Sequence, residues 1–225
     1  MRRMLRVLGT LLVIGGIGML AWAFTVWRWQ DPVTAVYTHL EQRELSRGFD
    51  ELMAGYVAPP APQGEPVAVG DAAKAFRESL RTGDVVGRLE IPSIGVTAMI
   101  VEGTDDETLK RGPGRYSDLF LPGEGELVYV AGHRTTYSAP FSKIDHLRKG
   151  DLVVVEVPYG RFEYRITGHR IVREDELWVL ESKGREVLAL QACHPRFFAT
   201  HRYIAYAEPV DAELRTAAGA DDGDA

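Results

Sequence analysis

The chain has 225 residues, of which 45% are hydrophobic, enough for one folded domain with additional segments. Its 26 lysines and arginines stand against 32 aspartates and glutamates, so the basic excess typical of nucleic-acid-binding proteins is absent and no nucleic-acid partner is expected. The sequence has one cysteine, Cys193, which excludes an internal disulfide. In an exported protein such a residue is either an intermolecular partner or a free reactive thiol.

The N-terminal segment has the composition of a membrane-spanning helix. The run from Val7 to Trp27 contains no charged residue, and as a helix it would be about 31 Å long, close to the thickness of a bilayer core. Arg2, Arg3 and Arg6 precede the run, so the positive-inside rule predicts a cytoplasmic N-terminus and an extracellular remainder.

A cleaved signal peptide is the alternative, because Ala21-Trp22-Ala23 fits a cleavage site. The apolar run continues past this site, which favours an uncleaved anchor. We therefore expect residues 1–30 to comprise a cytoplasmic N-terminus and a single membrane anchor.

Residues 31–83 are expected to form a helical stalk and a linker. Asp31 and Pro32 are typical of a helix cap followed by the first helical position. Apolar residues then recur at helical spacing and predict a stalk helix: Val33, Val36, Tyr37, Leu40 and Leu45.

Two further elements complete this connecting region. The proline-rich stretch 56–70 predicts an extended spacer. A short helix is expected from Asp71, as its cap, to Gly83. Its apolar face would hold Ala72, Phe76 and Leu80.

From residue 84 the pattern changes to short strands rich in β-branched and aromatic residues. The segments with this pattern are 85–92, 96–103, 126–132, 151–158, 161–172, 186–193 and 201–210. Seven or eight such strands predict a mainly β domain, either a closed barrel or a sandwich, over residues 84–211. The acidic end, residues 212–225, is expected to be disordered.

Cys193 ends a predicted strand. Alternation along this strand places Leu188 and Leu190 on one face and Cys193 on the other. Most free cysteines are small buried hydrophobes. Outside the cell, however, a thiol is exposed to oxidants, and this favours a functional reason for keeping it.

A nucleophilic thiol needs a partner that maintains the thiolate. His133 is the best candidate, because it lies where an apolar strand opens into the polar run 133–137. His194 is adjacent to Cys193 and should point away from it, which leaves His201 as the second choice. The remaining histidines are expected to lie on the stalk, on the surface or in strand packing: His39, His146 and His169.

An arginine near a thiolate stabilises it or donates to a developing oxyanion. Arg202 opens the last predicted strand. Composition alone does not distinguish Arg202 from Arg134 and Arg196.

Two longer segments resemble the sortase family of cysteine transpeptidases. They are "AGHRTTYSAPFSKIDHLRKGDLVVVEV" and "LALQACHPRFFATHRYIAYAE". The resemblance covers roughly residues 85 to 210 and is strongest to class E, with class D as its neighbour. It implies a closed barrel of about eight strands with short helices, preceded by a single N-terminal transmembrane helix, and a catalytic set of Cys193, His133 and Arg202 without a cofactor or metal.

The resemblance also implies a reaction and its partners. The thiol would attack the peptide bond after threonine in an LPxTG or LAxTG sorting signal at the C-terminus of a surface protein, and a peptidoglycan-precursor amine would resolve the acyl-enzyme. His133 would be the acid for the leaving amine, and Arg202 would stabilise the oxyanion. Tyr137 matches a tyrosine linked to preference for alanine in the signal, and Thr135 lies in the same substrate-binding segment.

The sequence departs from the family pattern before the nucleophile. Sortases usually carry TLxTC, whereas this chain has alanine at both threonine positions, Ala189 and Ala192. If the second hydroxyl binds substrate, its loss costs about 1–3 kcal/mol, or about tenfold to a hundredfold in rate. Ala192 is therefore assigned to the substrate-binding set. The usual GPGHY also carries Arg115 in place of histidine.

Two other functions stay open. A sortase-like module that binds signals or partner proteins without turnover would tolerate the alanines. A different cysteine enzyme of the cell wall is disfavoured. The histidine-glycine-cysteine context of L,D-transpeptidases is absent, and His133 precedes Cys193, whereas peptidoglycan endopeptidases place the cysteine before the histidine.

The acidic run 102–107 could offer carboxylates to calcium, but it lacks EF-hand spacing and predicts a solvated turn.

Overall fold

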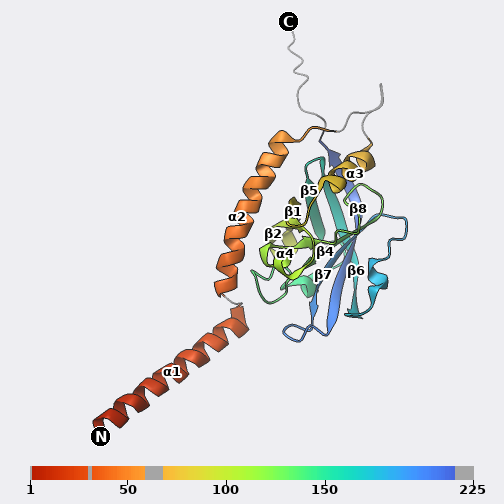
Figure 1. Cartoon of the computed structure of the whole chain (residues 1–225). Helices are drawn as coiled ribbons and strands as arrows, with labels where there is room; N and C mark the ends of the chain where they lie inside the picture. The colour runs from red at the N-terminus through yellow and green to blue at the C-terminus, as the bar shows by residue number, and fades with distance from the viewer. Residues whose placement is uncertain (1, 30–31, 59–67, 216–225) are drawn as a thin grey trace.

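The computed structural model describes residues 2–29, 32–58 and 68–215. Three helices precede a β-barrel (Figure 1). Most of the predicted spacer lies outside the described residues, as does the predicted acidic tail beyond residue 215. Residues 212–214, which were also expected to be disordered, belong instead to the last strand.

Eight strands close into a barrel in the order β1-β2-β3-β4-β7-β8-β6-β5. The strands are β1 (Val85–Ile91), β2 (Val96–Glu102), β3 (Gly114–Arg115), β4 (Leu127–Gly132), β5 (Leu152–Val157), β6 (Gly160–Arg173), β7 (Val187–His194) and β8 (His201–Leu214). Neighbours are antiparallel except for the parallel pairs β2–β3 and β4–β7. The predicted mainly β barrel is thus confirmed, and the sandwich is excluded. The two-residue strand β3 is too short to show a periodicity in the sequence.

The barrel core follows from alternation along the strands. On β7, Leu188, Leu190 and Ala192 are fully buried inside the barrel. Gln191 and Cys193 belong to the opposite, outer face and are only partly buried. The predicted division of this strand into a core face and an accessible face is therefore confirmed.

A second apolar cluster covers the outer face of β4, β7, β8 and β6. The short 3-10 helix η3 (Leu177–Leu180) packs on this face through Val179. The buried residues of the cluster are Leu119, Leu127, Tyr129, Val172, Val179, Ala189 and Ile204. One side of the sheet is thereby covered along part of its length, and Cys193 lies beyond the covered part.

The acidic run 102–107 is only partly the solvated turn that its composition predicts. Glu102 is buried and accepts two hydrogen bonds from Arg115, each of 2.6 Å, in a bidentate ion pair. Arg115 also donates to the backbone carbonyl of Leu119. Such a pair needs both partners, because either charge alone would be buried without compensation. Arg115, at the position of the usual histidine, is therefore a structural residue.

The end of the same run starts a helix. Asp105 caps α4 (Asp106–Arg111) by accepting hydrogen bonds from the backbone amides of Glu107 and Thr108. Hydrogen bonds from the Thr108 side chain and amide lower the pKa of Asp105. In the described part of the chain, no group of three histidine, cysteine or acidic residues is placed to hold a metal ion.

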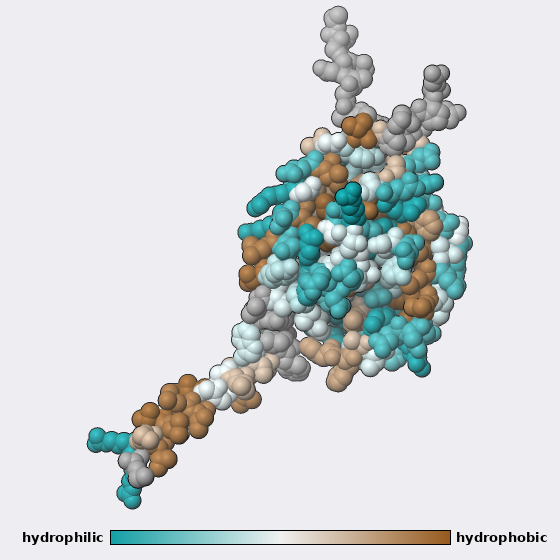
Figure 2. All heavy atoms as spheres, in the orientation of Figure 1, coloured by the Kyte–Doolittle hydropathy of each residue, from teal (hydrophilic) through white to brown (hydrophobic). Residues whose placement is uncertain are grey.

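The first helix, α1 (Arg2–Trp29), contains the predicted membrane span. Its segment Arg2–Thr25 is long and apolar enough to cross a bilayer by length and composition, and none of it is buried against the barrel. Figure 2 shows an apolar rod with hydrophilic side chains at its N-terminal end.

The second helix, α2 (Pro32–Gly55), lies against the barrel instead of standing free. Leu45 and Phe49 are buried against Met99 and Val101 of β2. The predicted stalk is therefore corrected to a docked helix. The predicted face is also wrong in its first half, because Val36, Tyr37 and Leu40 are exposed.

Polar side chains dock the first half of α2. The Gln42 amide donates to the carbonyls of Met99 (3.1 Å) and Arg111 (2.8 Å) and accepts from the Met99 amide (2.6 Å). The buried Thr38 hydroxyl lies 2.9 Å from the Lys110 carbonyl. Apolar periodicity misses this face because its contacts are hydrogen bonds to the backbone of β2 and α4.

The third helix, α3 (Val69–Ser79), closes one end of the barrel with Ala72, Ala73 and Phe76 buried. Ala72 and Phe76 of the predicted apolar face are confirmed, whereas Leu80 lies just beyond the helix and is partly buried. Both predicted ends are corrected: the N-cap is Ala68, with Asp71 in the first turn, and the helix ends at Ser79 before Gly83.

Because α2 is docked, truncation of a side chain on its buried face should lower the free energy of unfolding far more than truncation of an exposed one. Phe49→Ala removes a side chain that is 1% exposed and should lower the free energy of unfolding by about 3–5 kcal/mol. The control Val36→Ala removes a side chain that is 63% exposed and should change it by less than about 0.5 kcal/mol. Urea unfolding of the full chain in detergent measures both, and equal losses would contradict the docked arrangement.

Candidate active site

Three neighbouring strands bring the predicted residues together. Cys193 on β7 is the direct antiparallel partner of Arg202 on β8. On the other side of β7, the parallel register pairs Ala192 with Gly132, so His133 follows at the level of Cys193. Opposed residues of an antiparallel pair, such as Cys193 and Arg202, have β-carbons only about 4.5–5.5 Å apart. The two registers therefore place the arginine on one side of the thiol and the histidine on the other.

A cavity of about 320 Å³ opens at this point, and Cys193, His133 and Arg202 all line it. Its walls come from β4, β7, β8, the end of β6, η3, α4 with the residue Thr104 before it, and the segment after β3. Its other lining residues are Thr104, Asp106, Leu109, Tyr116, Tyr129, Ala131, Gly132, Val172, Arg173, Glu174, Glu176, Leu177, Val179, Leu180 and Gln191. We refer to it as the Cys193 cavity.

The three predicted substrate-binding residues lie outside the walls of this cavity. Ala192 is fully buried in the barrel core, so its side chain points away from Cys193. Tyr137 and Thr135 are partly buried in the segment that follows His133. Tyr137 contacts the His133 ring, with 5.2 Å between ring centroids.

His133 is held in a partly dry environment. Its Nε2 is inaccessible and has no hydrogen-bond partner among the described residues. Desolvation lowers the pKa of His133, with Lys110 acting in the same direction and Asp106 opposing. The imidazole is therefore mainly neutral near pH 7.

The backbone after His133 is strained. Tyr137, Ser138 and Ala139 have φ angles of 51°, 59° and 39°, in the left-handed region that non-glycine residues rarely occupy. A side chain at Gly132 would place its β-carbon 2.6 Å from the Phe141 ring, so a glycine is required before His133. We refer to residues 133–140 as the His133 loop.

The first turns of α2 hold this loop. The Tyr137 amide donates to the Thr34 hydroxyl (3.1 Å), and the Ser138 hydroxyl donates to the Ala35 carbonyl (3.4 Å). The Tyr37 and Tyr137 rings meet edge to face, with centroids 6.4 Å apart. A helix that begins beside the predicted membrane anchor thus supports the residue that covers His133.

Arg202 lines the cavity while its guanidinium is already anchored. Its Nη1 donates to the carbonyls of Ala199 (2.7 Å) and His201 (3.1 Å). Its Nη2 donates to a carboxylate oxygen of Glu174 (3.3 Å). These bonds fix the guanidinium beside Cys193 and leave donor capacity for an anion.

Arg134, which composition did not distinguish from Arg202, has a different place. It is buried and forms an ion pair with Asp145 (2.6 Å). It also donates to the Cys193 carbonyl (3.3 Å) and lies 2.9 Å from Nδ1 of His194. Burial, followed by the Arg134 charge, lowers the pKa of His194. Arg134 therefore ties the His133 loop to the end of β7.

Sequence reasoning missed Gln191 and Tyr129. The Tyr129 hydroxyl donates to the Gln191 side-chain carbonyl at 2.7 Å, and both residues line the Cys193 cavity. Burial raises the pKa of Tyr129, so its hydroxyl stays protonated and can donate. The available signal was the strand period, which places Gln191 on the face of Cys193 two positions before it.

The other histidines are elsewhere. His201 forms a hydrogen bond between its Nδ1 and the Thr200 hydroxyl (2.9 Å), and it does not line the Cys193 cavity. His146 is exposed, and His169 stacks on Tyr203 with centroids 4.9 Å apart. His39, on α2, lines a separate cavity between α2 and the barrel.

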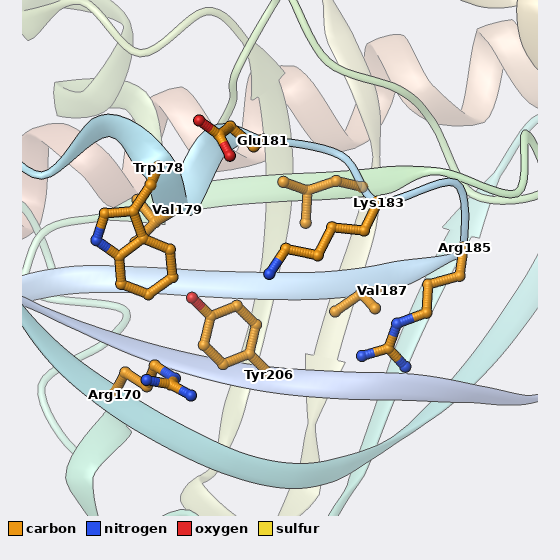
Figure 3. A pocket seen from close by; sticks show the side chains of 9 residues that line it. Arg170, Trp178, Val179, Glu181, Lys183, Arg185, Val187 and Tyr206 are labelled. Carbon is orange, nitrogen blue, oxygen red and sulfur yellow. The ribbon is translucent and has the colours of Figure 1, made fainter.

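A further cavity, of about 200 Å³, lies on the other side of η3 (Figure 3). Trp178 and Tyr206 flank it, and the Lys183 side chain reaches over it. Arg170, beneath the rings in Figure 3, lies 5.7 Å from the Trp178 ring centroid. It contains none of the predicted site residues, so we assign the candidate site to the Cys193 cavity.

The sortase domain family matches residues 89–210 of the chain. The chain belongs to the sortase family. The matched region contains His133, Cys193 and Arg202, together with every strand from β2 to β7.

Individual sortases are similar to this one at moderate identity. Sortase D of Bacillus subtilis (strain 168) is 37% identical over 133 residues, which are 57% of this chain and 66% of that protein. Sortase E1 from Streptomyces coelicolor, solved with a tripeptide in the active site, has a TM-score of 0.55 and 25% identity over 61% of this chain and 94% of that one. This sortase spans slightly less than two thirds of its Bacillus relative.

The fold also matches a Clostridium perfringens Sortase D5 transpeptidase, with a TM-score of 0.63 and 23% identity. That alignment covers 76% of this sortase and 99% of the other chain. The relatives thus include both of the classes, D and E, to which the sequence motifs point.

The cover that Tyr137 provides for His133 predicts a measurable change. Tyr137→Ala exposes the imidazole to water, so the lowered pKa of His133 should rise toward the usual value of 6.5. NMR titration of the His133 ring proton, assigned by its absence in His133→Gln, measures it. Tyr206→Ala, at the cavity across η3, is the control and should leave this pKa unchanged.

The lowered pKa of His133 also determines how this residue makes the stability of the folded protein depend on pH. His133 in the folded state binds its proton less readily than in the unfolded chain. Its contribution to the free energy of unfolding is therefore complete above about pH 6.5 and is lost as the pH falls through the folded-state pKa.

A His133 pKa that does not respond to Tyr137→Ala would show that the ring is desolvated by other groups.

Proposed function

We propose that this protein is a membrane-anchored cysteine transpeptidase. It cleaves an LPxTG- or LAxTG-type sorting signal after threonine and transfers the acyl group to an amine of a cell-wall precursor. The observation that carries the proposal is that Cys193 on β7, Arg202 on β8 and His133, directly after β4, line one cavity at the ends of three adjacent strands.

Acylation uses the thiol and the imidazole as a pair. A proton passes from Cys193 to His133, and the thiolate attacks the threonine carbonyl carbon to form a carbon–sulfur bond. As the tetrahedral intermediate collapses, the peptide carbon–nitrogen bond breaks and the imidazolium gives its proton to the leaving amine. The lowered pKa of His133 makes the imidazolium a minority form that is a ready proton donor.

Deacylation repeats these steps in reverse order. The acceptor amine attacks the thioester carbonyl, loses a proton to His133 and forms the new peptide bond, and the thiolate leaves. The thioester divides one difficult exchange of amines into two easier steps. In both steps the carbonyl oxygen becomes negative, and the guanidinium of Arg202 beside Cys193 is suited to stabilise it.

The likeness to other sortases supports a peptide substrate. The Sortase E1 structure holds a tripeptide in its active site, and the Sortase D5 protein is described as a transpeptidase. We propose that Tyr137 and Thr135 influence the second signal position through the His133 loop, since neither lines the Cys193 cavity.

We further propose a single-pass membrane location. The apolar helix α1 would cross the bilayer with Arg2, Arg3 and Arg6 on the cytoplasmic side, and residues from 32 onward would lie outside the cell. The partners are then surface proteins that carry a C-terminal sorting signal and a peptidoglycan-precursor amine.

The proposal predicts the effect of removing each side chain. The full chain is mixed with LAxTG and LPxTG peptides and amine donors, and products are followed by mass spectrometry. Cys193→Ala should abolish transfer, and His133→Ala and Arg202→Ala should lower kcat/KM by about a hundredfold or more. His146→Ala, at an exposed histidine, is the control and should retain wild-type rates.

The competing function is a module that binds sorting signals without turnover. It requires bound peptide with neither amine product nor covalent adduct in the wild-type protein. Full activity in any of the three variants would remove that residue from the proposed mechanism.

Ala192 provides a separate prediction about the missing threonine. Because its side chain packs in the core, a threonine there places its hydroxyl among apolar groups and not in the Cys193 cavity. Ala192→Thr should therefore leave kcat/KM within about threefold and lower the free energy of unfolding by about 1–3 kcal/mol, the cost of an unpaired buried polar group. A tenfold gain in turnover would show that the hydroxyl reaches the substrate.

A further inference from the structure

The connection between β7 and β8 presents two exposed aromatic side chains. Phe197 and Phe198 are 55% and 78% exposed, the latter being the most exposed large hydrophobic residue of the described barrel. Arg196 lies over the Phe197 ring, 5.6 Å from its centroid. We call residues 196–198 the aromatic tip.

The tip has a defined backbone. The amides of Phe198 and Ala199 both donate to the Pro195 carbonyl, at 3.3 and 3.1 Å. Phe197 and Ala199 have φ angles of 72° and 53°, so the chain turns back sharply. Arg202 donates to the Ala199 carbonyl and ties the base of the turn to β8. The two rings are therefore held outward by an ordered turn.

The tip lies at the end of the barrel that contains the Cys193 cavity. It belongs to the connection between His194, the last residue of β7, and His201, the first of β8, and these two residues are register partners. The His133 loop lies at this end too, because Arg134 contacts the Cys193 carbonyl and His194.

The anchor is attached at the same end. Thr34 contacts the His133 loop, and the backbone from Trp29 at the end of α1 to Thr34 spans at most about 17 Å. In Figure 1 the β7–β8 connection, the C-terminal end of α1 and the N-terminal end of α2 all lie toward the lower part of the view. An anchored chain therefore keeps this end of the barrel near the membrane.

The charges around the tip are compatible with a lipid surface. Arg196 belongs to the tip. The neighbouring carboxylates of Glu174 and Asp175 are ion-paired with Arg202 and Arg173. Segments that lie in the membrane interface combine apolar side chains such as phenylalanine with lysine or arginine, whose charged groups reach the head groups.

We propose that the aromatic tip inserts into the outer surface of the bilayer and gives the barrel a second membrane contact besides α1. This inference rests on the proposed membrane anchoring. Two contacts at one end fix the orientation of the barrel, so the Cys193 cavity stays at the lipid surface, where an acceptor amine attached to a lipid would reach it. The occupant of the exposed aromatic surface is thus lipid, not a second copy of the chain or a substrate peptide.

The presence of a single cysteine allows a direct test that is independent of catalysis. In a Cys193→Ala background, Phe198→Cys is labelled with a nitroxide, and the full chain is reconstituted in phosphatidylcholine–phosphatidylglycerol vesicles. Power saturation by oxygen and by a water-soluble nickel chelate reports depth in the bilayer. The matched control is Lys183→Cys, which is exposed and precedes the opposite end of β7.

At position 198 the ratio of oxygen to nickel accessibility should exceed that at position 183 at least threefold. Equal ratios would place the tip in water and overturn the proposal. Protection of position 198 from both reagents would also overturn it, because the tip would then be covered by protein.

A second experiment, in proteins that keep Cys193, measures how the aromatic tip affects acyl transfer to the amine. The amine that the wild-type protein accepts is supplied either free or coupled to a dioleoyl lipid in the vesicles. Phe197→Ser with Phe198→Ser should lower transfer to the lipid-coupled amine about fivefold to tenfold and leave transfer to the free amine within twofold. The double variant Phe197→Leu with Phe198→Leu keeps the apolar surface and should transfer to the lipid-coupled amine at the wild-type rate.

Equal losses with both amines would overturn the inference, since the tip would then act on the site itself. Absence of transfer in the wild-type protein would instead count against the proposed transpeptidase, and the nitroxide measurement would still decide the membrane contact.

Discussion

The parallel pairing of β4 with β7 is the contact on which the candidate site depends. It sets Gly132 opposite Ala192, so His133 emerges beside Cys193, while the antiparallel pairing with β8 supplies Arg202 from the other side. A one-residue slip of β7 would turn Cys193 into the core and expose its neighbours. The buried leucines of β7 prevent this slip, because they fill the barrel only in the observed register. Core packing and site geometry therefore have one cause.

The sheet positions the start of the His133 loop but does not hold its strained backbone. That support comes from α2, whose Thr34 and Ala35 bind the loop where three successive residues have positive φ angles. Conformations of this kind persist only where surrounding contacts outweigh their cost. The contacts of Gln42 and Phe49 further along α2 supply this stabilisation. The environment of His133 thus depends on residues about a hundred positions earlier in the chain.

The strands were predictable from the sequence because they are rich in β-branched and aromatic residues and bury one face, whereas the choice of a barrel over a sandwich needed the family resemblance. Cys193 and His133 were predictable because each ends an apolar strand, whereas Arg202 needed the family resemblance to separate it from Arg134. The docked face of α2 was not predictable, since Thr38 and Gln42 bind backbone groups that no local pattern reveals. Ala192 was assigned to substrate by analogy with threonine, although strand alternation turns its side chain toward the core.

Because α2 is docked on the barrel, the region between the predicted anchor and the barrel contains a packed helix and not a free stalk. A free stalk followed by a spacer would let the barrel move away from the membrane and rotate. Instead the docked helix begins three residues after α1 ends, and the proline-rich segment follows it and leads to α3. In the proposed membrane-anchored protein, a packed helix would therefore set the distance between the membrane and the site. For the same reason, a fragment that begins at the barrel itself would lack the side chains that hold the His133 loop.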